Sequence, residues 1–159
     1  TGHSLIKDKM RQIGADLAGE MSGHMFFAER YYGFDDAIYA SARLAEIMSQ
    51  DVTKPLSTYL SNWPETHNTP EIRLDCPDEI KFRVVDRAVE YFQSLTGDFQ
   101  VLNVDGARIN FSDGWGLVRA SNTQAVLVLR FEAETEERLQ EIREFFENPL
   151  QEWIEELRG

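Results

Sequence analysis

An aspartate–glycine pair at residues 105–106 is the feature that most constrains the fold of the second half of the chain. It lies between two runs rich in strand-forming residues, 99–103 and 108–111. Glycine accepts the positive φ that a tight hairpin turn needs, so an Asp-Gly pair in this setting is a strong β-hairpin signal. Adjacent antiparallel strands are therefore expected here.

The segment before the hairpin predicts a strand followed by a helix. Apolar and polar residues alternate over 71–76, as in a half-buried strand. Pro77 suits the first position of a helix, which Gly97 is expected to end. The expected apolar stripe of this helix is Phe82, Val85, Val89 and Phe92.

The segment after the hairpin completes a small domain. Strands are expected at 115–120 and 125–132, and an amphipathic helix over 135–148 that Pro149 breaks. The alternative is that the helix extends beyond Pro149 through Leu150, Trp153, Ile154 and Leu157. The order β-α-β-β-β-β-α predicts an α+β fold, in which a layer of helices packs on an antiparallel sheet.

The chain is expected to divide into two domains, 1–63 and 64–159, and the polar segment bounded by prolines at residues 64–70 is interpreted as the linker at the start of the second. The first part is expected to contain helices at 4–13 and 34–50 and strands at 15–20 and 24–29. The expected buried stripe of the second helix is Ile38, Ala42, Ala45 and Met48. Two strands bury little surface, so this part is expected to be the end of an α/β domain whose other strands lie upstream.

The charge of the chain disfavours several classes of partner. Its formal net charge is -12, so nucleic acid and anionic membranes are poor partners. No apolar run is long enough to span a membrane. The single cysteine is consistent with a reducing cytoplasm. An anionic ligand would need a small, locally basic site.

The turn at residues 19–24, GEMSGH, is a first candidate site. Glu20, Ser22 and His24 place a carboxylate, a hydroxyl and an imidazole within one turn between two expected strands. A carboxylate can accept hydrogen bonds from two adjacent hydroxyls, and serine can donate or accept. The turn therefore suits neighbouring hydroxyls of a sugar, although an ordinary polar hairpin turn has similar residues.

The turn that follows Arg119 is a second candidate. Ser121, Asn122 and Thr123 lie between two strongly apolar runs and supply two hydroxyls, an amide and backbone N–H groups. With a guanidinium as bidentate partner, such a loop can surround a phosphate. The alternative is a plain hairpin. His3 and Lys7 lie one turn apart on the first helix and could present positive charge, or could be only solvated.

Five stretches resemble the α-D-phosphohexomutase superfamily, in its bacterial phosphomannomutase/phosphoglucomutase branch. Residues 1–7 (TGHSLIK), 19–27 (GEMSGHMFF) and 32–36 (YGFDD) are similar to the third domain of that family. Residues 114–123 (GWGLVRASNT) and 126–131 (VLVLRF) are similar to its fourth domain. The resemblance covers almost the whole chain in the right order, and it implies a small TBP-like fold for residues 64–159.

The resemblance implies an activity and roles for residues. A phosphoserine in the first domain exchanges phosphoryl groups with a hexose phosphate, mannose or glucose 1- or 6-phosphate, and a loop of the second domain holds Mg²⁺. The sugar-binding residues would be Glu20, Met21 and Ser22, with His3 and His24 lining the cleft and available for proton transfer. The phosphate-binding residues would be Arg119, Ser121, Asn122 and Thr123.

The chain contains neither the serine loop nor the Asp-rich metal loop of that family. Because phosphoryl transfer needs the nucleophile and the metal together, the chain alone is expected to be inactive and to depend on N-terminal domains of the same polypeptide. There are two alternatives. The chain could be a natural stand-alone module that binds a sugar phosphate or another partner, or it could be part of a phosphoglucosamine mutase.

Overall fold

The computed structural model describes residues 2–158, and the chain divides between Trp63 and Pro64 into two compact units. Unit 1 runs up to Trp63, and unit 2 begins at Pro64. Each is described by itself. Within residues 2–158, no helix is both long and apolar enough to cross a membrane.

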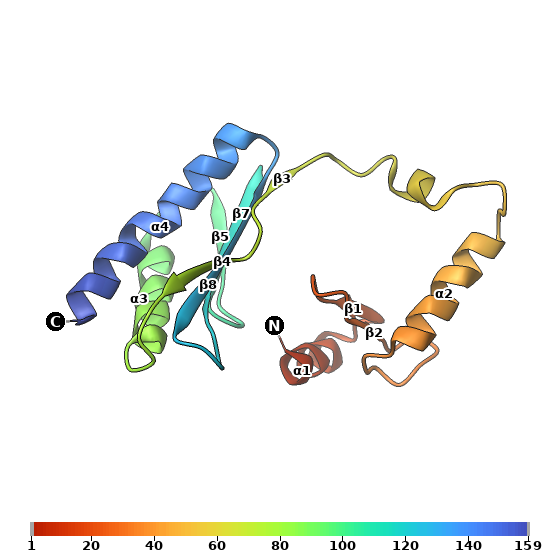
Figure 1. The fold of residues 1–159 in the computed structure, drawn as a ribbon, viewed down its shortest axis with the longest axis horizontal. Coiled ribbons are helices and arrows are strands. Elements are labelled where there is room, and N and C mark those ends of the chain that lie inside the picture. The colour runs from red at the N-terminus through yellow and green to blue at the C-terminus, as the bar shows by residue number, and fades with distance from the viewer. Residues whose placement is uncertain (1, 159) are drawn as a thin grey trace. The chain divides into compact units, whose positions relative to one another are not determined.

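Unit 2 is built on a six-stranded antiparallel sheet in the order β3-β8-β7-β6-β5, with β4 also pairing with β8 (Figure 1). From β4 onward the expected order β-α-β-β-β-β-α is confirmed, with the short strand β3 in front of it, and the hairpin is confirmed too, with Leu102 paired with Arg108. The bounds are β3 His67–Asn68, β4 Ile72–Asp75, α3 Lys81–Ser94, β5 Phe99–Leu102, β6 Ala107–Phe111, β7 Gly114–Ala120, β8 Val126–Ala133 and α4 Glu136–Arg158.

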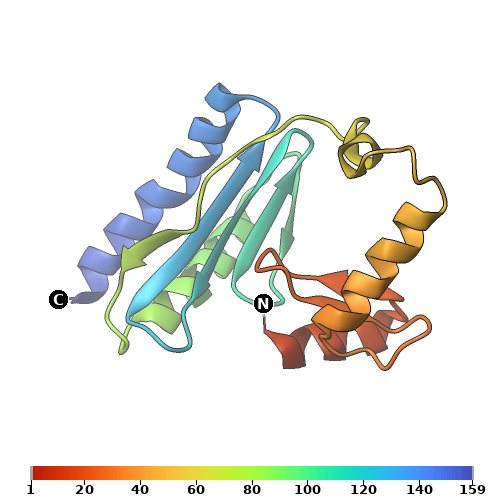
Figure 2. The same cartoon turned by 45° about the vertical axis from the view of Figure 1, so that its right-hand side comes forward.

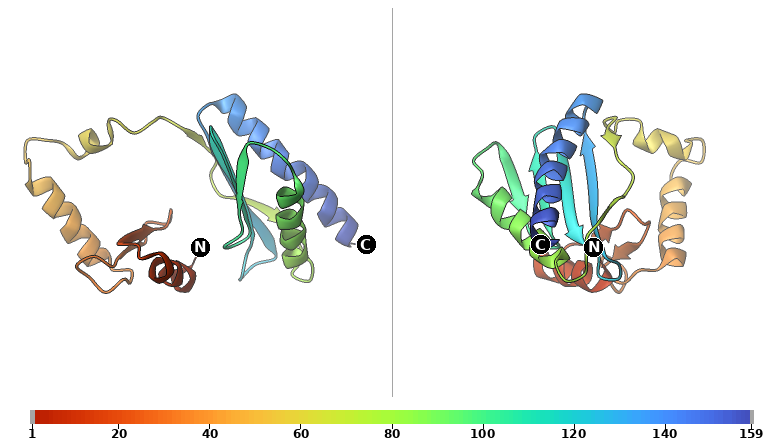
Figure 3. Two further views of the ribbon diagram at one scale, coloured as in Figure 1. Left: turned by 180° about the vertical axis from the view of Figure 1, so that it is seen from behind. Right: turned by 60° about the vertical axis from the view of Figure 1, so that its left-hand side comes forward.

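Helices α3 and α4 cover one face of this sheet, as Figure 2 and the left view of Figure 3 show. Residues of β7 and β8 that point to the helices, among them Val118, Leu129 and Phe131, are fully buried with Phe146 of α4. Alternate residues of β7, including Arg119, therefore lie on the opposite face of the sheet.

Three expectations for unit 2 were wrong. Pro149 does not break the last helix, because Leu150 and Ile154 beyond it are buried in the core and their burial outweighs the missing N–H. Phe82 is 53% exposed, whereas Lys81 beside it is buried. The segment 64–70 is not only a linker, since β3 lies within it and pairs with the end of β8.

Unit 1 contains a short β-hairpin with a helix beside each strand. The bounds are α1 His3–Ile13, β1 Leu17–Gly19, β2 Met25–Phe27, α2 Ala37–Ser49 and the 3₁₀ helix η1 Leu56–Leu60. The two strands are antiparallel, with Gly19 opposite Met25. Phe26 of β2 is fully buried and pairs with Asp35 through an isolated bridge, so it anchors the segment before α2.

The expected buried stripe of α2 was also wrong. No residue of this helix is buried, and Ile38 is 84% exposed. The apolar residues do recur at helical spacing, but within the described part of this unit α2 packs mainly beside β2 and contacts η1 through the Tyr59 hydroxyl, which donates to the carbonyl of Ile47 at 3.4 Å. A stripe becomes a core only where a second layer covers it, and the described residues of unit 1 supply no such layer.

Candidate functional site

The β1–β2 turn of unit 1 holds Glu20, Ser22 and His24 in a fixed geometry. The N–H of Glu20 donates to the carbonyl of His24 at 2.9 Å, and the N–H of Gly23 donates to the carbonyl of Glu20 at 2.9 Å. Gly23 has a φ of 90°, which a residue with a side chain adopts only with strain. The glycine thus allows the turn to close and bring the three polar side chains to one side.

These three side chains contact one another. The Oγ of Ser22 lies 2.7 Å from the Nδ1 of His24. The Oε2 of Glu20 lies 3.4 Å from the same nitrogen, and the Glu20 side chain is only 10% exposed. The Nδ1 of His24 therefore has two oxygen partners, which orient the ring. Met21, at the tip of the turn, is exposed.

The start of α1 adds His3 to this group. The N–H of Gly2 donates to the Oε1 of Glu20 at 2.9 Å, which ties the beginning of the helix to the turn. The Nε2 of His3 is 4.0 Å from the Oε2 of Glu20, and the His3 ring is centred 4.9 Å from the His24 ring. The structure therefore brings together His3, Glu20, Ser22 and His24, four of the residues that the sequence singled out.

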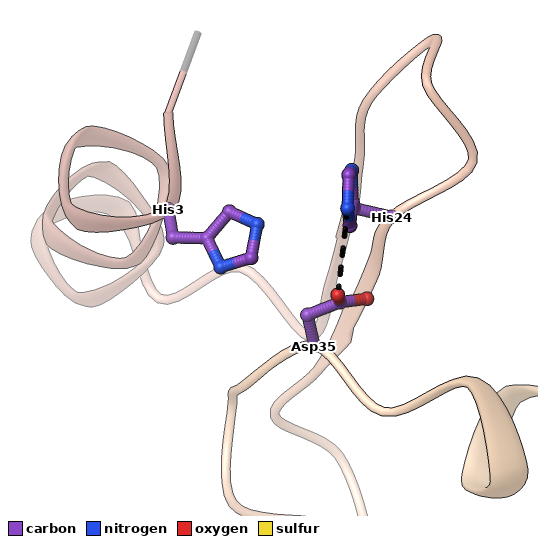
Figure 4. A group of neighbouring side chains, drawn as sticks. All are labelled: His3, His24 and Asp35. Carbon is purple, nitrogen blue, oxygen red and sulfur yellow. Dashed lines mark ion pairs between the residues drawn. The ribbon is translucent and has the colours of Figure 1, made fainter.

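Asp35 is a neighbour of this group that the sequence analysis did not select. Its Oδ1 accepts the N–H of Met25 at 3.1 Å, and its Oδ2 lies 3.8 Å from the Nε2 of His24. Figure 4 shows His3, His24 and Asp35 around one space. The only feature of the sequence that pointed to Asp35 was its position in residues 32–36, one of the stretches that resemble the third domain of the family.

Asp36, the next residue, fixes this segment to α2. Its side chain accepts the N–H of Tyr39 as the N-cap of the helix and the hydroxyl of Tyr31 at 2.5 Å. The hydrogen bond from Tyr31, followed by that from Tyr39, holds the pKa of Asp36 below its usual value. The same bond, with burial, raises the pKa of Tyr31 to about 12.

In unit 2, the loop after Arg119 is a tight turn held by Ser121. Ser121 is buried, and its Oγ accepts the N–H groups of Thr123 at 3.4 Å and Gln124 at 3.2 Å. Asn122 and Thr123 are exposed. Within the structure, Ser121 therefore shapes the loop, whereas Asn122 and Thr123 offer their side chains to solvent.

Lys81 is a second support of this loop that the sequence analysis missed. Its Nζ donates to the carbonyl of Gln124 at 3.0 Å and pairs with Asp78 at 2.6 Å. Arg73 of β4 also donates to the side chain of Gln124, at 2.9 Å. The C-terminal end of the loop, at Gln124, is thus tied to α3 and to β4.

Arg119 is positioned by β7 with its backbone opposite Val128 of β8. It is partly exposed on the face of the sheet that α3 and α4 do not cover. Among residues 2–158, no carboxylate forms an ion pair with its guanidinium. A guanidinium with no carboxylate partner in this part of the chain can bind an anion.

Two family models together match nearly all of the chain. The phosphoglucomutase/phosphomannomutase α/β/α domain III model matches residues 1–66, and the C-terminal domain model of the same family matches residues 71–148. Both matches place the fold of this chain in the class of phosphoglucomutase/phosphomannomutase domains.

Named relatives agree with this class. The chain is 51% identical over 150 residues to a phosphomannomutase/phosphoglucomutase of Pseudomonas aeruginosa, covering 94% of the chain and 32% of that protein. It is 44% identical over 146 residues to a phosphoglucomutase of Neisseria gonorrhoeae, covering 92% of the chain and 31% of that protein. The chain therefore spans about a third of the length of these relatives.

A solved structure supports the same conclusion. A phosphoglucomutase/phosphomannomutase family protein of Burkholderia thailandensis superposes with a TM-score of 0.78 at 42% identity, over 95% of this chain and 31% of that one. The chain belongs to the phosphoglucomutase/phosphomannomutase family and corresponds to its domains III and IV.

Proposed function

We propose that this chain supplies the sugar-hydroxyl and phosphate contacts of a mutase that interconverts hexose 1-phosphate and hexose 6-phosphate through a phosphoserine and a bisphosphate intermediate. The observation that carries the proposal is the cluster of His3, Glu20, Ser22 and His24, which the β1–β2 turn and the start of α1 hold together.

The sugar side of the proposal rests on the free acceptors of Glu20. Its Oε1 already accepts the N–H of Gly2, and its Oε2 lies between His24 and His3. The carboxylate retains lone pairs for a sugar hydroxyl, and the Ser22 hydroxyl can serve a neighbouring one. A short rigid turn with small polar groups suits a sugar that must bind in either of two orientations.

The phosphate side rests on Arg119. A guanidinium presents a planar fork that matches two phosphate oxygens, and no described carboxylate competes for it. Asn122 and Thr123 lie beyond it on a loop that Ser121 and Lys81 hold in shape. We assign the phosphate that is not being transferred to this loop.

Proton transfer is assigned to His24. Since Ser22 and Glu20 occupy its Nδ1, the Nε2 remains to hold or move a proton. His3 lies beside it and is the second candidate for this role.

The full-length enzyme is proposed to use Mg²⁺, which supplies electrostatic stabilisation of the transferring phosphoryl group when bound. Mg²⁺ prefers oxygen ligands, and the one group of potential ligands found in residues 2–158 contains two histidines and a single carboxylate. That group does not fit Mg²⁺. We therefore place the Mg²⁺ ligands and the nucleophile in other domains, and expect the 159-residue chain alone to show no turnover.

Mannose and glucose phosphates are the proposed substrates, because the P. aeruginosa relative is named for both sugars. A second candidate is a phosphoglucosamine mutase. A probable phosphoglucosamine mutase of Methanopyrus kandleri is 30% identical to the chain over 151 residues. Rates with glucose 1-phosphate, mannose 1-phosphate and glucosamine 1-phosphate would separate the two.

The test is mutation of the turn in a full-length enzyme that contains this segment. Glu20→Ala and Ser22→Ala should each lower kcat/KM by roughly 10- to 100-fold, because a hydrogen bond involving a charged group is worth ~1.5–3 kcal/mol. Glu65→Ala and Ser57→Ala are matched controls on exposed residues. If all four variants retain the parent kcat/KM, the turn has no role in binding sugar.

A further inference from the structure

The residues His3, His24 and Asp35 of unit 1 bring three potential metal ligands to one place. One ligand atom from each lies within 4.8 Å of the others, and no other such group was found in residues 2–158. They come from the first turn of α1, the residue before β2 and the segment before α2 (Figure 4). We propose that these three residues bind a divalent transition metal such as Zn²⁺, and that the bound metal excludes the sugar.

The first support is the fixed position of Asp35. Its Oδ1 is engaged by the N–H of Met25, and its backbone pairs with Phe26. The Oδ2 is left facing the Nε2 of His24 at 3.8 Å. That distance is too long for a hydrogen bond, so the two atoms are not in direct contact. The gap between a carboxylate oxygen and a ring nitrogen is where a cation would lie.

The second support is the other nitrogen of His24. Its Nδ1 lies 2.7 Å from the Oγ of Ser22 and 3.4 Å from the Oε2 of Glu20, so the proton of a neutral ring is best placed on Nδ1. The lone pair is then on Nε2, on the side of Asp35. Metal-binding histidines commonly donate their other N–H to a carboxylate or other oxygen in this way.

His3 completes a three-ligand set. Its ring packs edge-on against the buried Phe26 at 5.1 Å and lies 4.9 Å from the ring of His24. Tetrahedral Zn²⁺ with bonds of about 2.0–2.1 Å places its ligand atoms about 3.3 Å apart. The ligand atoms lie within 4.8 Å of one another, so their separations must shorten by up to about 1.5 Å. The side chains of His3 and His24 are 50% and 42% exposed, which leaves them room to turn inward.

The donor set selects the metal. Two imidazoles and one carboxylate suit Zn²⁺, Ni²⁺, Co²⁺ or Cu²⁺, whereas Mg²⁺ and Ca²⁺ prefer oxygen ligands. Three protein ligands also leave a position open for water or another small ligand. The site should therefore bind transition metals in the presence of excess Mg²⁺.

The inhibitory part of this inference rests on the proposed function, because His3 and His24 are assigned there to the sugar site. A metal bound to both rings would occupy the space of the sugar hydroxyls and fix His24 away from proton transfer. Metal binding itself rests only on the geometry of unit 1.

Binding is tested on the 159-residue chain by calorimetric titration with Zn²⁺ and by the visible absorption of Co²⁺, with Mg²⁺ in excess. We expect one strong site per chain. His3→Ala, His24→Ala and Asp35→Asn should each weaken it at least about 10-fold, since loss of a group that only hydrogen-bonds to a metal ligand already costs about 10- to 100-fold. Asp35→Asn retains an oxygen for the Met25 N–H, so folding should survive, as circular dichroism would verify.

His67→Ala is the matched control, because the third histidine of the chain lies in unit 2 and pairs with Glu136 at 3.2 Å. It should bind as tightly as the parent. Several weak sites per chain, or binding that none of the three unit 1 variants weakens, would show adventitious coordination by surface groups. Either result would overturn the inference.

Inhibition is tested in a full-length enzyme that contains this segment. Zn²⁺ should inhibit with Mg²⁺ in excess, hexose phosphate should relieve the inhibition, and Asp35→Asn should lower the sensitivity of the remaining activity. Metal binding without competition by hexose phosphate would contradict the sugar site and leave the metal site standing. No metal binding, together with impaired Glu20 variants, would refute only the metal site.

Discussion

Gly116 of β7 allows α4 to approach the sheet, and its replacement by alanine has a calculable consequence. A Cβ at this position would lie 2.4 Å and 2.8 Å from two ring carbons of Phe146. Carbon atoms in contact are normally about 3.5–4.0 Å apart, so the overlap exceeds about 1 Å. Phe146 is fully buried and packs between the rings of Phe92 and Phe131, so it has no free space to move into.

Overpacking of this kind costs about 1–3 kcal/mol, and the smaller entropy of the unfolded alanine chain offsets about 0.4–1 kcal/mol. Gly116→Ala should therefore destabilise unit 2 by about 1–2 kcal/mol. For a domain of this size, that lowers Tm by roughly 4–16 °C. The measurement is thermal and urea unfolding followed by circular dichroism, with Ser112→Ala, an exposed position near the start of the same strand, as control.

Phe146→Leu provides the decisive second variant. If the clash with the ring is the cause, Gly116→Ala should cost less in the Phe146→Leu background, with a coupling of about 0.5–3 kcal/mol. Strict additivity of the two substitutions, or a Gly116→Ala protein as stable as the parent, would refute the packing argument.

Two further predictions concern the proposed phosphate site and the start of α2. In a full-length enzyme, Arg119→Lys should raise KM almost as much as Arg119→Ala, about 10-fold or more, because lysine lacks the planar fork. Arg83→Lys, on the exposed surface of α3, is the control. A near-normal KM for Arg119→Lys would show that charge alone suffices for phosphate binding. Asp36 has a lowered pKa, so its ionised form stabilises unit 1 above the ordinary pKa of the carboxyl group, and this stability is lost as pH falls through the lowered pKa. Tyr31→Phe should reduce this acid-side loss in an NMR titration of α2 amides, and an identical pH profile for both proteins would contradict the role of the Tyr31 hydroxyl.

Local sequence patterns were enough to predict much of the fold of unit 2. The Asp105-Gly106 turn, the alternation over 71–76 and the two apolar runs around residues 121–123 each depend on neighbours in the chain, and the order of strands and helices followed from them. The turn at residues 19–24 could be predicted as a candidate site for the same reason, because one short hairpin brings Glu20, Ser22 and His24 together.

The burial of individual side chains was harder to predict from the sequence, because it depends on what packs against each helix or strand. The stripe of α2 has the right period, yet Ile38 is exposed where no second layer covers it. Pro149 is a helix breaker by its local chemistry, but the residues after it enter the core and the helix continues. On α3 the expected stripe holds for Val85, Val89 and Phe92, but at the start of the helix Lys81 is buried in place of Phe82.

The sequence by itself determined the hairpins, the order of elements and the residue types in both loops, since these depend on backbone preference and on spacing along the chain. Only the tertiary structure added Asp35 to His3 and His24, and Lys81 to the loop that it supports 43 residues away. Neither contact leaves a periodic signal. Each exists because separate elements pack and bring side chains together, a result that depends on the burial of the whole unit rather than on any local run of residues.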